Sequence, residues 1–264
     1  MSDRGRIICL IPAFNAAEHV GAVVSGVSQY VDKCIVIDDG STDETLSVAT
    51  RAGATVLRRE QNGGKTAALQ EGFGYAERES WEFLVTVDGD GEHSADDVPR
   101  LVDALLQRRA DAALGVRPES TSVRLTGERI IAGMLRRWLH VEIADATCGL
   151  RCYRTGHVPA PGDCCTGYGI DIALAVLATS DPTTVVIEVP IVSSPVRKAG
   201  LRPDIMSDCV QAIRAFLPLD DYEARHAVDT LLVDIAERKP IILGASHAAT
   251  TLAFSLERGV YQRA

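Results

Sequence analysis

The sequence predicts an α/β fold built on a mostly parallel sheet with helices on both faces. Short β-branched runs alternate with helical segments through the first half of the chain, and a polar or glycine-rich turn follows each run. Two helical segments carry a capping signature, with Ser41 three residues before Glu44 and Ser94 three residues before Asp97. The polar motifs therefore fall between a strand and a helix, at the sheet edge where such folds bind ligands.

The first half of the chain supplies five predicted strands, and the second half has a looser pattern. The five strands are expected at residues 6–11, 33–38, 54–57, 83–88 and 112–116. The second half is expected to contain a helix at 126–140, a short strand at 147–153, a helix from about 170 and a strand at 185–190. Beyond residue 202 the pattern is helical with breaks at Pro218 and Pro240, and 241–244 fits either a strand or a helix start.

Length and composition indicate one large domain with a C-terminal extension. The 264 residues are 46% hydrophobic and 24% charged, which is typical of a soluble globular protein. The formal net charge of −9 argues against nucleic acid as a partner, and against docking on an anionic membrane by charge alone.

The start of the chain and its cysteines predict a cytoplasmic protein. The apolar run within residues 1–15 is too short for a signal peptide, and the seven cysteines include no CxxC pair, which favours reduced thiols. The longest apolar stretch, 240–254, falls short of the roughly 20 residues that cross a bilayer. We therefore expect no transmembrane segment, while peripheral association with a membrane stays compatible with the sequence.

Two carboxylates directly follow the apolar strand predicted at 83–88. In the segment 85–93, VTVDGDGEH, Asp88 and Asp90 are separated by one residue, a spacing that lets both point the same way. Hard oxygen ligands suit Mg²⁺ or Mn²⁺, and an ion held by few carboxylates keeps open positions for phosphate oxygens. The alternative is a glycine-rich surface turn.

A second acidic motif ends the strand at 33–38. In the segment 35–43, IVIDDGSTD, the adjacent carboxylates of Asp38 and Asp39 can accept hydrogen bonds from a base N–H and from ribose hydroxyls. A turn followed by a helix cap is the alternative.

A third polar motif, NGGKT at 62–66, opens a helix, so that its backbone amides and Lys65 can meet a phosphate. It is not a complete P-loop, because that pattern requires a glycine where Arg59 stands. A capped helix with a solvated lysine is the alternative here.

Taken in order, the motifs resemble the family 2 glycosyltransferases, in particular the dolichyl-phosphate and polyprenyl-phosphate mannose or glucose synthases. The resemblance covers about residues 6–202 and is carried by eight segments. Residues 11–18 are similar to the family's IPAYNE motif, 38–42 to DDGSTD, 62–65 to NxGK and 88–93 to DADxQH. Residues 115–117 are similar to GxR, 145–151 to DxxCGFR, 169–171 to the acidic FE pair and 189–200 to VPI…RxxG. The chain departs from the pattern at Gly89, Glu92 and Asp171, where Ala, Gln and Glu are usual.

The resemblance implies a GT-A fold, which is a Rossmann-like, mostly parallel sheet with helices on both faces. It places a glycosyltransferase domain at 1–202, with a nucleotide-sugar-binding half at 1–117 and an acceptor half at 118–202. Residues 203–264, which the resemblance does not explain, are expected to form a C-terminal, mainly helical extension, and we consider its segment 228–260 as a lid or a homo-oligomer interface.

The resemblance also assigns the site residues. The nucleotide pocket would be lined by Pro12, Phe14, Asn15 and Glu18, with Asp38 and Asp39 on the base and ribose and Lys65 near the phosphates. The metal, Mg²⁺ or Mn²⁺, would be held by Asp88, Asp90 and Glu92, with Asp88 also close to the bound substrate. Glu92 adds a formal charge beside the ion.

The family expectation is an inverting transfer from a GDP- or UDP-linked sugar, and the acceptor decides whether a base is needed. A hydroxyl acceptor needs a general base, for which Asp171 and Asp145 are the candidates. A polyprenyl phosphate is largely ionised at neutral pH and needs cations instead. Arg117 and Arg129 stand where the lipid-phosphate synthases place acceptor arginines, and Arg197 is a further candidate.

The sequence is also compatible with other functions. One is a glycosyltransferase that acts on a soluble small molecule in specialised metabolism, and another is a non-catalytic module that binds nucleotide sugars. A nucleotidyltransferase would also use strand-end carboxylates, but it gives the segments 145–151 and 189–200 no role. Tyr168 fits packing either over an acceptor or in the core, and His93 fits a structural role or a ligand role.

Overall fold

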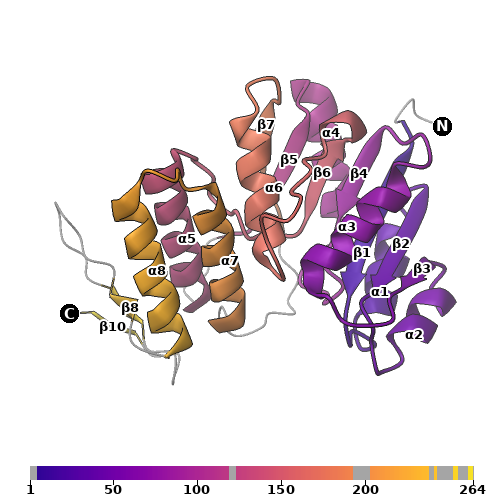
Figure 1. Cartoon of the computed structure of the whole chain (residues 1–264). Coiled ribbons are helices and arrows are strands. Elements are labelled where there is room, and N and C mark those ends of the chain that lie inside the picture. The colour runs from indigo at the N-terminus through magenta and orange to yellow at the C-terminus, as the bar shows by residue number, and fades with distance from the viewer. Residues whose placement is uncertain are drawn as a thin grey trace.

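The computed structural model describes residues 5–118, 123–192 and 203–237, together with the short backbone segments 241–242, 252–254 and 261–263. Its main sheet has seven strands in the order β3-β2-β1-β4-β6-β5-β7 (Figure 1). Only β6 runs antiparallel to its neighbours, β4 and β5, so the predicted mostly parallel sheet is confirmed. The strands are β1 Ile7–Ala13, β2 Lys33–Asp38, β3 Thr55–Arg58, β4 Phe83–Thr86, β5 Ala112–Val116, β6 Arg151–Arg154 and β7 Val186–Pro190.

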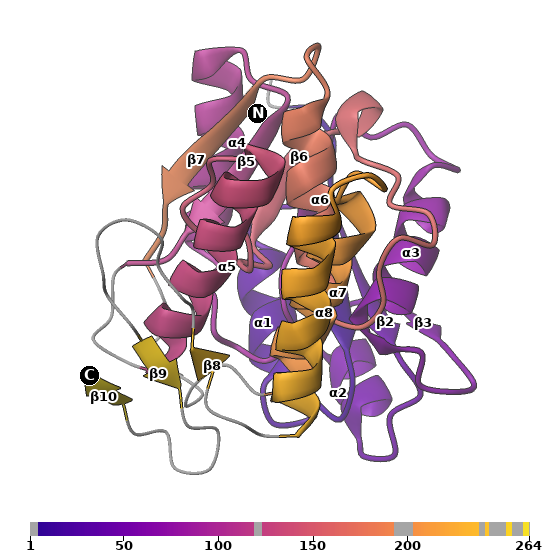
Figure 2. The same ribbon diagram turned by 60° about the vertical axis from the view of Figure 1, so that its left-hand side comes forward.

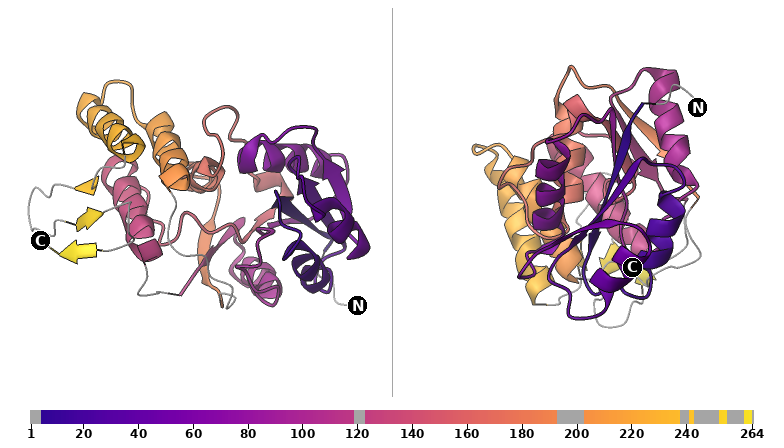
Figure 3. Two further views of the ribbon diagram at one scale, coloured as in Figure 1. Left: turned by 90° about the horizontal axis from the view of Figure 1, so that it is seen from below. Right: turned by 90° about the vertical axis from the view of Figure 1, so that its right-hand side faces the viewer.

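Helices cover both faces of this sheet, as the three views of Figures 2 and 3 show. Side chains of β1 alternate between two hydrophobic clusters, since Ile8 and Leu10 belong to one and Ile7, Cys9 and Ile11 to the other. Burial on both faces is what a central parallel strand requires. The helices are α1 Val20–Val27, α2 Thr45–Arg51, α3 Gly64–Ala76, α4 Asp97–Arg108, α5 Val123–Leu139, α6 Gly169–Ser180, α7 Pro203–Phe216 and α8 Tyr222–Ala236.

Two of the helices begin later than their predicted capping signatures indicate. Helix α2 begins at Thr45 and α4 at Asp97, and neither Ser41 nor Ser94 occupies the N-cap position. Ser41 is engaged elsewhere, because its hydroxyl accepts the amide N–H of Asn15 at 2.9 Å. The capping prediction was therefore wrong at both helices, and at Ser41 a contact between two loops takes the place of the cap.

Helices α7 and α8 share the hydrophobic cluster of α5 and α6. Met206, Val210 and Val228 are buried in it together with Ile170, and Figure 2 shows α5, α7 and α8 standing side by side. The helical pattern predicted beyond residue 202 is confirmed as far as Ala236. After it, the strand alternative for 241–244 is found as β8 Ile241–Ile242. The helical pattern is not found at β9 Leu252–Phe254 and β10 Tyr261–Arg263, which form a small antiparallel sheet with β8. These strands are rich in β-branched and aromatic residues.

Within the described ranges, no helix has both the length and the apolar character needed to cross a membrane. The division of the chain at residue 202 stays a prediction, because 193–202 lie outside the described residues.

Candidate functional site

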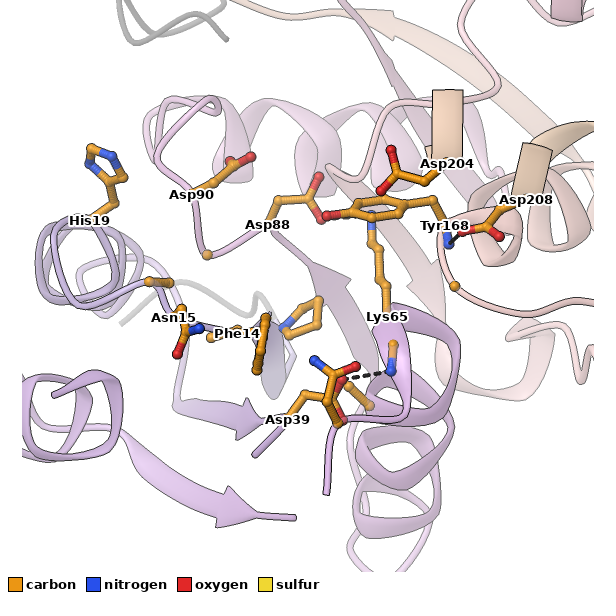
Figure 4. Close-up of a pocket in the computed structure, with 18 residues that line it drawn as sticks. Phe14, Asn15, His19, Asp39, Lys65, Asp88, Asp90, Tyr168, Asp204 and Asp208 are labelled. Atoms are coloured by element: carbon orange, nitrogen blue, oxygen red, sulfur yellow. Dashed lines mark hydrogen bonds and ion pairs between the residues drawn. The ribbon is translucent and has the colours of Figure 1, made fainter. Parts of the chain in front are cut away.

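A pocket of about 570 Å³ opens at the carboxyl ends of the central strands (Figure 4). The loop after β1 contributes Phe14 and Asn15, and the loop after β2 contributes Asp39. The segment after β4 contributes Asp88 and Asp90. The sequence prediction that these polar motifs meet at one edge of the sheet is therefore seen in the structure.

The two adjacent carboxylates after β2 have different environments. Asp38 is fully buried and does not line the pocket, because one oxygen accepts the amide N–H of Ser41 at 3.0 Å and the other lies 3.2 Å from the Arg58 guanidinium. Asp39 lines the pocket, and its two oxygens accept the amide N–H groups of Gly63 and Gly64 at 3.0 and 2.7 Å. Of the pair, only Asp39 faces the space in which a ligand would lie.

Lys65 lies between two carboxylates that come from distant parts of the chain. Its Nζ atom is 2.6 Å from Oδ1 of Asp88 and 2.7 Å from Oδ2 of Asp171, and only 9% of its side chain is exposed. His93 approaches the other side of Asp88, with Nε2 3.4 Å from Oδ2. Lys65 is therefore a buried bridge between the segment after β4 and the helix α6, rather than a solvated lysine at a helix start.

This bridge changes the protonation equilibria of its members. Burial by itself raises the pKa of Asp88, but Lys65 and His93 more than reverse this effect and hold that pKa well below its usual range. Burial dominates at Asp171, whose pKa is raised although Lys65 and Arg151 act to lower it. Burial by itself lowers the pKa of Lys65, but Asp171 and Asp88 raise it by more, so the pKa lies above its usual value and the ammonium stays charged.

The segment 145–151 packs against the Asp88 carboxylate. An ideal Cβ on Gly149 would lie 2.2 Å from Oδ2 of Asp88, so the carboxylate rests directly on the glycine backbone. Thr86 fixes this glycine by donating its hydroxyl to the Gly149 carbonyl at 2.8 Å. Arg151 is fully buried and donates to the carbonyls of Cys148 and Ala146, both at 2.8 Å. Gly149 and Arg151 of this segment therefore both have structural roles.

The predicted three-carboxylate metal set is not assembled in the part of the chain that the structure describes. No group of three His, Cys, Asp or Glu side chains lies close enough together there to hold an ion. Glu92 is buried and does not line the pocket, and its amide N–H donates to Oδ1 of Asp90 at 3.1 Å. Asp88 and Asp90 both face the pocket, and two oxygen donors of this kind fit an ion that also binds a diphosphate.

Arg117 and Asp145 bind each other instead of facing the pocket. The Arg117 guanidinium donates to both Asp145 oxygens, at 2.7 and 2.6 Å, and it also lies 3.1 Å from Glu128. The side chains are 10% and 5% exposed. Burial raises the pKa of Asp145, but the paired Arg117 lowers it more, so this carboxylate is held ionised in an ion pair. Neither residue lines the pocket.

The remaining predicted residues divide between the pocket and the surface. Pro12, Phe14 and Asn15 line the pocket, and Asn15 adopts the left-handed conformation with φ 49°. Glu18 points to solvent with 86% of its side chain exposed. Arg129 is exposed on α5 and does not line the pocket, while Arg197 lies outside the described residues.

Three residues with ionisable side chains that line the pocket are absent from the sequence prediction, namely His19, Asp204 and Asp208. Asp204 and Asp208 lie four residues apart at the start of α7, directly after Pro203, so both carboxylates fall on one face of the helix. An acidic pair at this spacing, next to a proline at the first helical position, is the signal that could have found them. His19 carries no comparable sequence signal.

Comparisons with known proteins give a family match and several relatives. Residues 8–158 match the family model for glycosyl transferase family 2. Polyprenol monophosphomannose synthase from Mycolicibacterium smegmatis is 32% identical over 164 residues, which are 56% of this chain and 62% of that protein. Undecaprenyl-phosphate mannosyltransferase from Micrococcus luteus is 32% identical over 163 residues, which are 56% of this chain and 66% of that protein. The chain spans roughly half to two thirds of the length of such curated relatives.

Solved structures share the fold. Glucosyl-3-phosphoglycerate synthase from Mycobacterium tuberculosis, in complex with UDP, superposes with a TM-score of 0.65 at 22% identity and covers 82% of both chains. Mannosyl-3-phosphoglycerate synthase from Rubrobacter xylanophilus gives a TM-score of 0.69 at 15% identity, over 84% of this chain and 76% of that chain.

Proposed function

The chain belongs to glycosyl transferase family 2, and from this premise we propose that it transfers a sugar from a GDP- or UDP-linked donor to a polyprenyl-phosphate-like acceptor with inversion. One observation carries the proposal. A single pocket combines Asp39, which can contact a nucleoside, with Asp88 and Asp90, which can hold a cation at a diphosphate. Through Lys65 the same pocket borders the buried carboxylate of Asp171.

Asp88 and Asp90 are the residues that would hold Mg²⁺ or Mn²⁺. An ion held there would supply positive charge to neutralise the charge that develops on the departing diphosphate. Solved structures of glucosyl-3-phosphoglycerate synthase contain Mn²⁺ together with UDP, which supports a divalent metal for this fold. Lys65 and His93 hold Asp88 in its ionised form, the form that binds a cation. Glu92 stays a proposed third ligand that would have to turn toward the pocket.

The names of the two mannose-transferring relatives support a lipid-phosphate acceptor. A phosphate monoester is its own nucleophile at neutral pH, so no general base is needed for it. The enzyme would then work at the surface of the membrane that carries the lipid. Arg117, Arg129 and Arg197 remain the proposed cations for the acceptor phosphate, although Arg117 would first have to leave Asp145.

A hydroxyl-bearing soluble acceptor is a second candidate, and the pairing of the cations favours it. Lys65 is the only lysine or arginine among the described residues that line the pocket, and two carboxylates already engage it. For a hydroxyl acceptor, Asp171 is the proposed general base. Burial raises the pKa of Asp171, which brings a carboxylate closer to the range in which it accepts a proton effectively. Asp145 fits this role less well because its carboxylate faces Arg117.

The proposed function is tested by identifying the nucleotide product. Purified protein with Mn²⁺ and a panel of UDP- and GDP-sugars is expected to release the nucleoside diphosphate when undecaprenyl phosphate is added. Release of pyrophosphate or of a nucleoside triphosphate would instead indicate a nucleotidyltransferase. Product formation with a soluble alcohol, and none with the lipid phosphate, would select the second candidate.

Replacing Gly149 with alanine is expected to lower transfer about tenfold to a hundredfold while leaving the fold intact. The added Cβ would meet the Asp88 carboxylate at 2.2 Å, so this flexible side chain has to move away from its position at the pocket. A misplacement of about 1 Å at a reacting centre costs on the order of a hundredfold. Initial rates measured against Mn²⁺ concentration check this. Gly74→Ala is the matched control, because an added Cβ there meets nothing within 4 Å and transfer should be unchanged.

A further inference from the structure

The side chains that line the pocket assign a position to each part of a nucleotide sugar. Asp39, Asp88, Tyr168 and Asp208 all line it. In Figure 4 the Tyr168 ring overlaps Lys65 and Asp88, Asp208 lies next to Tyr168, and Asp39 lies apart from them. A donor with its nucleoside on Asp39 and its diphosphate at Asp88 would therefore have its sugar beside Tyr168.

Resting on the proposed function, we infer that the ring of Tyr168, held in place by Asp208 of α7, forms the binding platform for the transferred sugar. Tyr168 lines the pocket with 38% of its surface exposed, so part of this large aromatic side chain borders the space in which a ligand would lie. An aromatic face of this kind packs against the C–H face of a pyranose ring, and carboxylates beside it accept hydrogen bonds from sugar hydroxyls. The ligand class is a neutral hexose.

Asp208 fixes the backbone at Tyr168. Its Oδ2 atom accepts the amide N–H of Tyr168 at 3.0 Å, from a helix 40 residues further along the chain. Tyr168 is the N-cap residue of α6, whose own side chain makes no capping hydrogen bond. Asp208 therefore acts as the acceptor for the start of α6, the helix that carries Asp171 in its first turn.

Gly167, the residue before Tyr168, is held by hydrogen bonds from helix α3. The Gly167 carbonyl accepts both the amide N–H and the hydroxyl of Thr66 in α3, each at 2.9 Å. Gly167 has φ 52°, and an ideal Cβ on it would lie 2.0 Å from Oδ2 of Asp208. Only glycine allows Asp208 to approach this closely. The loop is thus fixed between a helix of the nucleotide half and the first helix beyond residue 202.

The sugar end of the pocket lies outside the part of the chain that the family model matches. That match ends at residue 158, whereas Tyr168 and Asp208 both follow it. The residues at the nucleoside and diphosphate positions, Asp39 and Asp88, lie within the match. The helix α7 therefore contributes to sugar selection and is more than an appendage to the transferase core.

The test compares binding of a nucleoside diphosphate with binding of the same nucleotide carrying a sugar. Isothermal titration calorimetry of the full chain with Mn²⁺ would use UDP against UDP-glucose and GDP against GDP-mannose. Tyr168→Ala is expected to raise the dissociation constant of the sugar nucleotide about tenfold and to change that of the diphosphate less than about twofold. Tyr168→Phe keeps the ring and is expected to bind like the wild type. An equal effect of Tyr168→Ala on both ligands would overturn the inference.

The role of Asp208 is tested by a double-mutant cycle. Asp208→Ala is expected to weaken sugar-nucleotide binding in the wild-type chain but to add nothing to Tyr168→Ala, because it acts through that residue. Asp208→Asn retains an acceptor oxygen for the Tyr168 amide and is expected to restore binding. Additive effects in the cycle, or no rescue by asparagine, would contradict the positioning role.

Controls separate this inference from the proposed function. Tyr222→Ala removes an aromatic ring that is 80% exposed on α8 and does not line the pocket, so its binding constants should match the wild type. If the wild-type chain bound neither the UDP pair nor the GDP pair, the proposed function itself would fail. Wild-type binding of a pair combined with an unchanged sugar dissociation constant in Tyr168→Ala would defeat the sugar platform alone.

Discussion

Asp90→Ala is expected to lower metal-supported sugar transfer by about a hundredfold to a thousandfold. Asp90 faces the pocket together with Asp88, and we propose the pair as the oxygen donors for a divalent cation at the diphosphate. Loss of one of two protein ligands weakens the cation's hold and removes several kcal/mol of charge stabilisation from the transition state. Initial rates over a range of Mn²⁺ concentrations measure the effect, and part of the lost rate should return at high metal concentration.

The control for Asp90→Ala is Asp103→Ala, which removes a carboxylate from the exposed side of α4. It changes the net charge by the same amount outside the pocket, so its rate and its metal dependence should equal those of the wild type. Unchanged metal-supported turnover in Asp90→Ala would remove the main support for a cation at this position. Equal losses in both variants would attribute the effect to overall charge.

The GT-A fold was predictable from the sequence because its cause is local in the chain. Residues 7–13 form a nearly continuous apolar run, and a strand buried on both faces requires such a run. The polar motifs after β1, β2 and β4 could be placed at one pocket because parallel strands end at the same edge. The superposition on the phosphoglycerate synthases confirms the predicted fold class.

The partners of the charged side chains could not be predicted in the same way. Lys65 and Asp171 are 106 residues apart, and Arg117 and Asp145 are 28 apart, so no local pattern records either pair. A motif identifies a carboxylate or an arginine, but its role depends on which charge the fold brings beside it. The sequence therefore indicated Arg117 as an acceptor cation, whereas the structure has it in a bidentate ion pair.

Lys65→Met is expected to abolish transfer and to lower the free energy of unfolding by about 3–5 kcal/mol. The ammonium lies within 2.7 Å of both Asp88 and Asp171, and it is the cation that offsets their mutual repulsion. Methionine fills a similar volume but leaves the Asp171 carboxylate, 6% exposed, without that charge. Urea unfolding followed by circular dichroism gives the stability, and a nucleotide-release assay gives the activity.

The double variant Lys65→Met with Asp171→Asn separates the two roles of the bridge. Removing the negative charge of Asp171 along with the positive charge of Lys65 leaves a neutral pair, which a protein interior tolerates far better than one unpaired ion. We expect the double variant to regain most of the lost stability and none of the activity, because the charged groups beside Asp88 are still missing. If the double variant were no more stable than Lys65→Met, an unpaired Asp171 charge would not be the cause of the instability. If it regained transfer, neither Lys65 nor Asp171 would be required for the reaction, and the general base for a hydroxyl acceptor would have to lie elsewhere.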